Sequence, residues 1–128
     1  MGRLNLDTNR VYLIIKARLK CDVLEAEKWM KEGSATFVFN LKEEKTKYFE
    51  WYLSDDNTEA TLIESYDDSD GAKKRVENHM ASPAAEEFMD RFEPLAWNYF
   101  GNVKQDLIDL TTPLGAKFQR YVGGFNHT

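Results

Sequence analysis

Residues 48 to 66 read YFEWYLSDDNTEATLIESY, and this stretch decides the fold. Apolar and polar side chains alternate over 48–53 and again over 60–66, with the period of two that is typical of β-strands. The acidic run at 54–57 suits a short hairpin loop. The sequence therefore predicts a β-hairpin whose first strand is rich in aromatic side chains.

The next residues, DDSDGAKKRVENHMASP at 67–83, predict a helix. It is expected to start near Ser69 and Asp70, because acidic side chains stabilise the positive end of a helix dipole. Ser82-Pro83 interrupts it, since serine caps and proline begins a second helical segment. The inner face of the two segments is expected to hold Ala72, Val76, His79, Met80, Phe88, Phe92 and Leu95. Pro94 is expected to end or kink the second segment.

Two further elements are expected before the hairpin. Residues 11–20 alternate between a wholly apolar face and a mixed face, which predicts a strand. Asp22 can cap a following helix, whose apolar stripe recurs every three or four positions to about Glu44. Residues 36–39 also have strand propensity, and Gly33 weakens a helix. We favour one helix over this whole stretch, because the stripe continues through its ambiguous part.

The last part of the chain is less regular. Residues 103–112 contain an apolar run that predicts a fourth core strand, 113–115 a turn or short helix start, and 118–122 a last short strand. The order strand, helix, strand, strand, helix, strand predicts an α+β fold, the ferredoxin-like split β-α-β sheet with helices on one face. We expect a single domain over residues 1–128, with 113–128 as a C-terminal extension.

Both faces of this sheet are expected to carry bulky apolar side chains. On the first long strand, Leu13 and Ile15 share one face and Tyr12 and Ile14 share the other. Helices on one face leave the second face uncovered. A second copy of the chain, related by a two-fold axis, is the simplest cover. We therefore expect a homodimer that forms a dimeric α+β barrel.

Composition limits the class of partner. The 128 residues carry a net charge of -5, and basic residues are interleaved with acidic ones, which argues against nucleic acid. Cys21 is the one cysteine and there are two histidines, so neither a disulfide nor a zinc site is expected. The sequence shows no targeting segment and no apolar run long enough for a bilayer. It therefore predicts a cytoplasmic protein without a membrane partner.

A family resemblance rests on the hairpin together with two short pieces, Ile63-Glu64-Ser65-Tyr66 and His79-Met80-Ala81-Ser82-Pro83. In this order they resemble the antibiotic biosynthesis monooxygenase domain, over roughly residues 10–112. The tail, Tyr121-Val122-Gly123-Gly124-Phe125, is similar to an extension of some relatives. The resemblance implies a dimeric α+β barrel with a pocket in each subunit, between helices and sheet. Some members oxidise anthrones or quinols with molecular oxygen and without metal or flavin, others degrade haem, and many have no known activity.

The resemblance also implies roles for particular residues. The family's common histidine corresponds to His79, and its aromatic residue at the end of the third strand, usually tryptophan, corresponds to Tyr66. Haem-degrading relatives carry a histidine ligand further along, where this chain reads Glu86-Glu87-Phe88-Met89. Haem degradation is therefore not expected, and neither is any other cofactor.

His79 is the candidate catalytic residue. With an ordinary pKa of ~6.5, its imidazole suits a general base that removes a proton from an activated phenol or a carbon acid. Trp51, Tyr52 and Tyr66 are candidates for binding a small aromatic molecule. Glu50 and Glu64 are the nearest carboxylates, and either could orient His79 or act as a base. The plainer alternative is structural. The histidine then packs at a helix end, the aromatic rings belong to the sheet or a dimer interface, and the carboxylate forms a cross-strand charge pair.

The function predicted first is a cofactor-independent monooxygenase that uses molecular oxygen on a small aromatic, quinol or polyketide-type substrate. An alternative is a non-catalytic dimeric small-molecule-binding or stress-response protein on the same scaffold. A third possibility is a cyclase or isomerase that uses the same base without oxygen.

Overall fold

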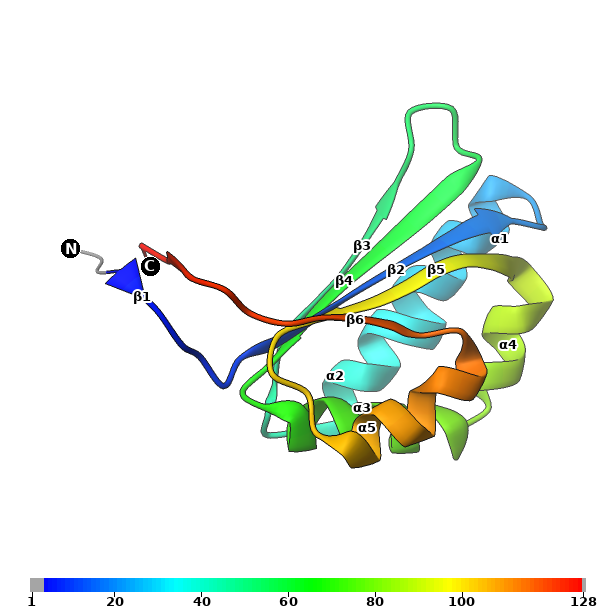
Figure 1. The fold of residues 1–128 in the computed structure, drawn as a ribbon. Coiled ribbons are helices and arrows are strands. Elements are labelled where there is room, and N and C mark those ends of the chain that lie inside the picture. The colour runs from blue at the N-terminus through cyan, green and yellow to red at the C-terminus, as the bar shows by residue number, and fades with distance from the viewer. Residues whose placement is uncertain (1–3, 128) are drawn as a thin grey trace.

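The computed structural model describes residues 4–127, and five of its strands form one mixed sheet (Figure 1). In their order across the sheet they are β3 (Thr46–Leu53), β4 (Glu59–Tyr66), β2 (Val11–Leu19), β5 (Phe92–Phe100) and β6 (Lys117–Gln119). Neighbouring strands are antiparallel except β5 and β6, which are parallel. The first four strands have the order of the ferredoxin-like split sheet, which confirms the predicted α+β fold class.

Helices cover one face of this sheet (Figure 1). They are α1 (Val23–Lys28), the π-helical segment η1 (Trp29–Thr36), α2 (Phe37–Leu41), α3 (Ser69–Met80), α4 (Ala84–Arg91) and α5 (Gln105–Thr111). No helix within residues 4–127 is long and apolar enough to cross a membrane.

The predicted hairpin is formed by β3 and β4. The backbone N–H of Ser54 donates to the carbonyl of Glu59 at 2.8 Å and closes the turn. The carboxylate of Asp56 accepts hydrogen bonds from both the N–H and the hydroxyl of Thr58. The acidic turn is therefore explained by local hydrogen bonds to its own backbone.

One continuous helical region follows β2, which confirms the predicted helix and excludes the alternative strand at 36–39. Asp22 caps its start with its side chain, and Lys42 ends it in the left-handed conformation with φ of 53°. Gly33 lies in the π-helical segment, where a Cβ atom would collide with the indole of Trp29. Glycine at this position therefore lets the ring lie close against the helix.

The prediction of a fourth core strand at 103–112 is wrong. Most of these residues form α5, and the fourth core strand is β5, which pairs with β2. Leu107 and Thr111 are both buried and lie one helical turn apart. A short apolar run fits either a strand or a buried helix, and here the helical spacing prevails.

The helical stripe predicted beyond Pro83 is only partly helical. The chain breaks between α3 and α4 at Ser82-Pro83 as predicted, but α4 ends at Arg91 and Phe92 begins β5. Phe88 and Phe92 still pack with their ring centroids 5.1 Å apart, which explains the helix-like spacing. Pro94 ends no helix. It lies within β5, beside an irregularity in the pairing with β2, where a strand tolerates proline.

The two ends of the chain run side by side away from the sheet (Figure 1). There β1 (Leu4–Asn5) pairs antiparallel with β7 (Gly124–Phe125), a contact that the sequence did not predict. A 3-10 helix, η2 (Thr112–Leu114), matches the expected turn or short helix start. The strand predicted at 118–122 is shorter and begins one residue earlier, as β6.

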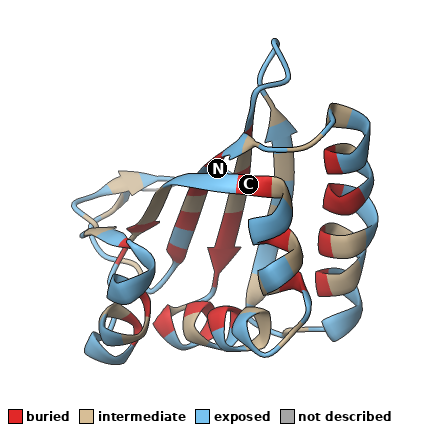
Figure 2. Cartoon of the chain, turned by 90° about the vertical axis from the view of Figure 1, so that its right-hand side faces the viewer, coloured by how far each residue is buried: buried red, intermediate tan, exposed pale blue. Residues whose placement is uncertain are grey.

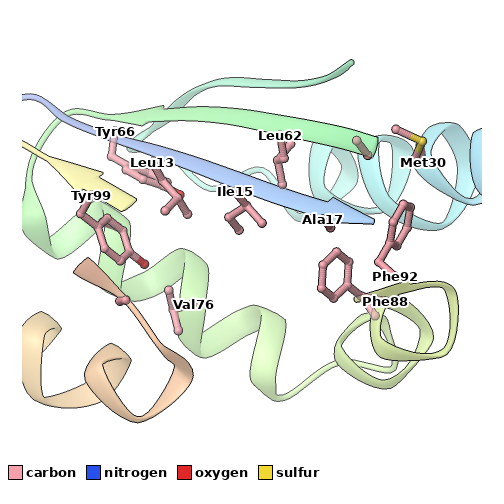
Figure 3. Packing of buried hydrophobic residues seen from close by; sticks show 14 of the residues in the cluster. Leu13, Ile15, Ala17, Met30, Leu62, Tyr66, Val76, Phe88, Phe92 and Tyr99 are labelled. Carbon is pink, nitrogen blue, oxygen red and sulfur yellow. The ribbon is translucent and has the colours of Figure 1, made fainter. Parts of the chain in front are cut away.

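The core lies between the helices and the inner face of the sheet (Figures 2 and 3). Alternate residues of β2 are buried from Val11 to Ala17, as the predicted apolar face requires. The largest fully buried side chains are Tyr66, Tyr99, Phe92, Leu13, Leu107, Val11 and Thr111.

The outer face of the sheet is open and partly apolar in the single chain. Tyr12 and Tyr52 are 37% and 45% exposed. Ile14 and Ile63 lie opposite each other on neighbouring strands, and both are half-buried. This is the second apolar face that the sequence predicted.

Candidate functional site

A cavity lies between the helices and the inner face of the sheet. Its volume is about 60 Å³, enough for a few water molecules, so a larger ligand needs the lining side chains to move apart. Its walls are mostly apolar and include Leu13, Trp29, Trp51, Leu62, Phe88 and Trp97. Glu64, Arg75 and His79 bring charged or titratable groups to the same space. An apolar cavity with a few converging polar groups is the usual form of a small-molecule site.

Aromatic rings form one wall. Trp29 and Trp51 meet edge to face with ring centroids 6.0 Å apart, and Trp51 stacks on Phe92 at 5.7 Å. The indole N–H of Trp29 donates to Glu87 at 2.9 Å, and that of Trp51 donates to Ser34 at 2.9 Å. Since both donors have an acceptor, these two rings offer flat apolar surface to a ligand.

Glu64 and Tyr66 both point inward from β4 and are only 4% and 0% exposed. The hydroxyl of Tyr66 donates a hydrogen bond to the carboxylate of Glu64. Burial raises the pKa of Glu64 to about 7, against the opposing influence of the Tyr66 hydrogen bond and the Arg75 charge. Glu64 can therefore gain or lose a proton near neutral pH. Burial also raises the pKa of Tyr66, so its hydroxyl stays protonated and acts as a donor.

Arg75 places a buried positive charge at the cavity. It is 4% exposed, and its Nη1 lies 3.2 Å from a carboxylate oxygen of Glu43, whose side chain is equally buried. The same carboxylate accepts hydrogen bonds from Asn78 at 2.7 Å and from Thr46 at 2.9 Å. Glu43 is thus held by three partners, whereas the N–H groups on Nη1 of Arg75 form no hydrogen bond with the described residues.

His79 lies on α3, one helical turn after Arg75, and lines the cavity. Burial, and then the Arg75 charge, lower the pKa of its imidazole. At neutral pH the ring is therefore neutral and can accept a proton. Its backbone carbonyl accepts a hydrogen bond from the Ser82 hydroxyl, but its imidazole has no hydrogen-bond partner within residues 4–127.

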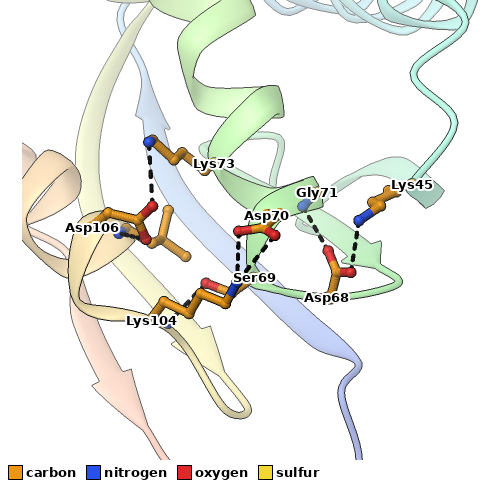
Figure 4. Close-up of polar contacts among 9 residues, drawn as sticks. Lys45, Asp68, Ser69, Asp70, Gly71, Lys73, Lys104 and Asp106 are labelled. Atoms are coloured by element: carbon orange, nitrogen blue, oxygen red, sulfur yellow. Dashed lines mark hydrogen bonds and ion pairs between the residues drawn. The ribbon is translucent and has the colours of Figure 1, made fainter.

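Polar contacts with other segments fix the start of α3 (Figure 4). Asp68 caps the helix by accepting from the N–H of Gly71 at 2.9 Å, and it pairs with Lys45 at 2.8 Å. The hydroxyl of Ser69 accepts from the backbone N–H of Lys104 at 2.9 Å. Two further ion pairs join α3 to the α5 region, Lys104 with Asp70 at 3.1 Å and Lys73 with Asp106 at 3.3 Å. These contacts position the helix that carries both the guanidinium and the imidazole.

The structure brings three of the predicted site residues, Trp51, Glu64 and His79, to one cavity. Tyr66 lies behind them and reaches the site through its hydrogen bond to Glu64. Tyr52 does not line this cavity. Successive side chains of a strand point to opposite faces, so Tyr52 projects outward from β3, where its hydroxyl donates to Glu50 at 2.8 Å. The roles of all these residues stay predictions.

Arg75 and Trp97 line the cavity but were not among the residues that the sequence predicted for the site. Arg75 precedes His79 by four positions on a helix, and this spacing was a usable signal for a shared face. Trp97 was missed because no strand was predicted at 92–100. The helical stripe was expected to reach Leu95, and no element was assigned to the residues just after it.

Cys21 and the acidic residues offer little further chemistry. Burial raises the pKa of the Cys21 thiol, which opposes a reactive thiolate. In the part of the chain that the structure describes, no group of three His, Cys, Asp or Glu residues could hold a metal ion.

Comparison with known proteins finds similarity in structure but no match by sequence. No family model and no curated protein matches the sequence. The crystal structure of MupZ from Pseudomonas fluorescens matches this chain with a TM-score of 0.70 and 18% sequence identity. The match covers 94% of this chain and 91% of the MupZ chain. SnoaB from Streptomyces nogalater, described as a cofactor-independent oxygenase, is 14% identical with a TM-score of 0.59. The match covers 77% of this chain and 96% of the SnoaB chain.

A third solved structure, Rv0793 from Mycobacterium tuberculosis, is 18% identical with a TM-score of 0.54, and covers 75% of this chain and 97% of its own. At these identities the likeness shows the fold. The chain therefore has the fold that its resemblance to the antibiotic biosynthesis monooxygenase domain predicted.

Proposed function

We propose that the chain is a cofactor-independent monooxygenase that acts on a small aromatic, quinol or polyketide-type substrate. One observation carries this proposal: two proton-accepting side chains, His79 and Glu64, meet in a single cavity walled by aromatic rings. The fold shared with SnoaB, described as a cofactor-independent oxygenase, supports it.

The proposed reaction begins with proton transfer. His79, neutral at physiological pH, accepts a proton from an acidic C–H or O–H group of the substrate. The electron pair left on the substrate carbon reduces molecular oxygen, and a carbon–oxygen bond forms to give a peroxide. Loss of water from this peroxide leaves a carbonyl group. A methylene group and one oxygen molecule thus become a carbonyl group and one water molecule.

Glu64 is the second candidate base. Its carboxyl lies in the same cavity, and its pKa of about 7 lets it take up a proton at the pH where His79 also acts. We place His79 first, since burial and the Arg75 charge keep its imidazole unprotonated at neutral pH.

One observation favours a non-catalytic binding protein instead. A catalytic histidine usually has a partner that orients its ring, and the imidazole of His79 has no hydrogen bond with any residue of the described range 4–127. In that case the same cavity binds a small molecule and releases it unchanged.

His79→Ala tests the proposal, with His127→Ala as the matched control, because His127 is exposed in the tail. Oxygen uptake is measured on a panel of anthrones and hydroquinones. Loss of the base should lower the rate by about 100-fold or more in His79→Ala and leave His127→Ala unchanged. An unchanged rate in His79→Ala removes this residue from the mechanism. Binding of panel members without any oxygen uptake by the wild type supports the binding protein.

A further inference from the structure

Two surface grooves lie behind one wall of the cavity. They run beside the edge strand β3, on the side where it faces η1 and α2, and their volumes are about 640 and 430 Å³. Phe49 lines the cavity and both grooves, whereas Val38 and Trp51 each line the cavity and one groove. Two other hollows, beside α3 and beside the paired chain ends, share no lining residue with the cavity. The side chains at β3 are therefore a thin wall between the cavity and the surface.

This wall belongs to the least constrained strand around the cavity. β3 is an edge strand and pairs with β4 alone. Its pairing is irregular between Thr46 and Tyr48, directly before Phe49. Such irregularities loosen a ladder locally and change the direction of a neighbouring side chain. Since the cavity holds only about 60 Å³, a larger ligand needs one wall to move, and this wall can move without disturbing the rest of the sheet.

Of the three side chains in this wall, Phe49 is the one that is free to turn. Trp51 is held by its hydrogen bond to Ser34 at 2.9 Å and by its stacking on Phe92. Val38 is 9% exposed, and its branched side chain is stiff in a helix. Phe49 is only half-buried and packs against the core from the outside. A change of rotamer can carry its ring into the adjoining groove, where there is room for it.

We propose that ligands enter the cavity from the grooves along β3, and that the Phe49 ring is the gate that limits which ligands enter and how fast. The ring stands closed in this structure. The inference rests on the proposed function only in taking the cavity as the ligand site. It makes Phe49 a determinant of ligand size at a position where no proton transfer is proposed.

A gate leaves a kinetic signature that a binding contact does not. It slows entry and exit alike, so its removal speeds both and changes the equilibrium little. Loss of a binding contact acts mainly on dissociation. The two rate constants, measured separately, therefore distinguish a gate from an ordinary wall residue.

Stopped-flow binding of 2-naphthol under nitrogen tests the gate. The three tryptophans of the chain, Trp29, Trp51 and Trp97, all line the cavity, so energy transfer from them reports the arrival of the probe. We expect Phe49→Ala to raise the association and dissociation rate constants together by about tenfold, with Kd changed by less than about threefold. Phe49→Leu keeps an apolar side chain of smaller reach, so it should remain folded and raise both rate constants to a lesser extent.

Two control variants remove a ring elsewhere. Phe39 lines the first groove but not the cavity and is 80% exposed, so Phe39→Ala should leave both rate constants unchanged. Phe88 lines the cavity from α4 and lines neither groove. Phe88→Ala should therefore raise the dissociation rate constant and leave the association rate constant close to that of the wild type.

Unchanged association in both Phe49 variants overturns the inference, because the ring then blocks nothing. An equal rise of association in Phe88→Ala also overturns it, since entry is then not confined to the β3 side. So does a complete lack of 2-naphthol binding by the wild type and by both Phe49 variants. No turnover is measured, so these outcomes are independent of oxygen uptake: a protein with this gate can lack oxygenase activity, and an oxygenase can lack this gate.

Discussion

Two residues set the proton balance of the cavity. Burial raises the pKa of Glu64 to about 7 and lowers the pKa of His79, and both changes favour the neutral form of the side chain. The apolar walls that would hold an aromatic ligand thus also prepare the two groups for proton transfer. Perturbed pKa values of this kind are common at functional sites.

Stability should depend on pH through these two residues in opposite directions. The folded state keeps the Glu64 proton up to about pH 7, whereas the unfolded chain releases it near the ordinary value of 4.5. The folded protein therefore binds more protons between these values, and its stability falls by about 3 kcal/mol as pH rises through this window. His79 acts in the other sense. Its lowered pKa means that stability falls as pH drops below about 6.5, where the unfolded histidine becomes protonated.

Glu64→Gln separates the two contributions, because it removes the titrating carboxyl and keeps His79. The free energy of unfolding is measured by urea titration at several values between pH 4.5 and 7.5. As pH rises through this range, we expect the free energy of unfolding of the variant to increase by about 3 kcal/mol relative to that of the wild type. Glu50→Gln is the control, since the Tyr48 and Tyr52 hydroxyls lower the pKa of the exposed Glu50 carboxyl out of this window. If the difference in free energy of unfolding between Glu64→Gln and the wild type does not change with pH, the result contradicts a buried Glu64 that stays protonated up to about pH 7.

The residues of the site were predictable in part. His79, Trp51 and Glu64 could be found from the hairpin, the helix and their order along the chain. Arg75 was harder to find, because a charged residue on a helix normally faces solvent, and its burial depends on Glu43 in the loop between α2 and β3. Tyr52 shows the opposite error. It was grouped with Trp51 because both are aromatic, although alternation along a strand separates them.

At the scale of elements, strong periodicity and clear end signals were reliable. The hairpin and the helix after Asp22 match the structure because alternation, an acidic turn and a long apolar stripe all agree. The prediction missed the strand β5 and placed a strand where the chain forms α5, and both errors have a physical cause. Phe88 and Phe92 pack together although they belong to different elements, and Pro94 suggested a helix end where the chain forms a strand. Tertiary packing decided both elements, and a local pattern could not reveal it.

The cap of α3 is the element that we expect to be most sensitive to a single change. Asp68→Ala removes the side-chain hydrogen bond to the N–H of Gly71, and loss of such a cap costs about 1 kcal/mol. Asp67→Ala is the control, since Asp67 is exposed and its contact with Lys47 is longer, at 3.6 Å. Urea titration at neutral pH should place Asp68→Ala below Asp67→Ala in stability. Equal stability of the two variants contradicts the role of the cap.

For the whole molecule, the open outer face of the sheet leads us to propose a homodimer. Ile14 and Ile63 lie opposite each other near its centre, with exposed tyrosine rings around them. A contiguous apolar face of this kind is usually covered by another surface. Burial of this face by a second copy about a two-fold axis removes it from water on both chains at once.

Ile63→Lys tests this assembly, because it places a charge in the proposed interface and leaves the inner core untouched. Light scattering after size exclusion should give the wild type twice the 14.9 kDa mass of one chain, and the variant a monomer mass. Leu24→Lys, on the 72% exposed Leu24 of α1, should remain dimeric. A monomeric wild type contradicts the proposed homodimer.

The most direct test of the proposed chemistry is the mass of the product formed under isotopically labelled oxygen gas by protein treated with a chelator. The proposed reaction predicts a product that contains one labelled oxygen atom, formed by the wild type and by His127→Ala but greatly reduced in His79→Ala. A product without the label, or with an unchanged mass as in an isomerisation, would contradict a cofactor-independent monooxygenase.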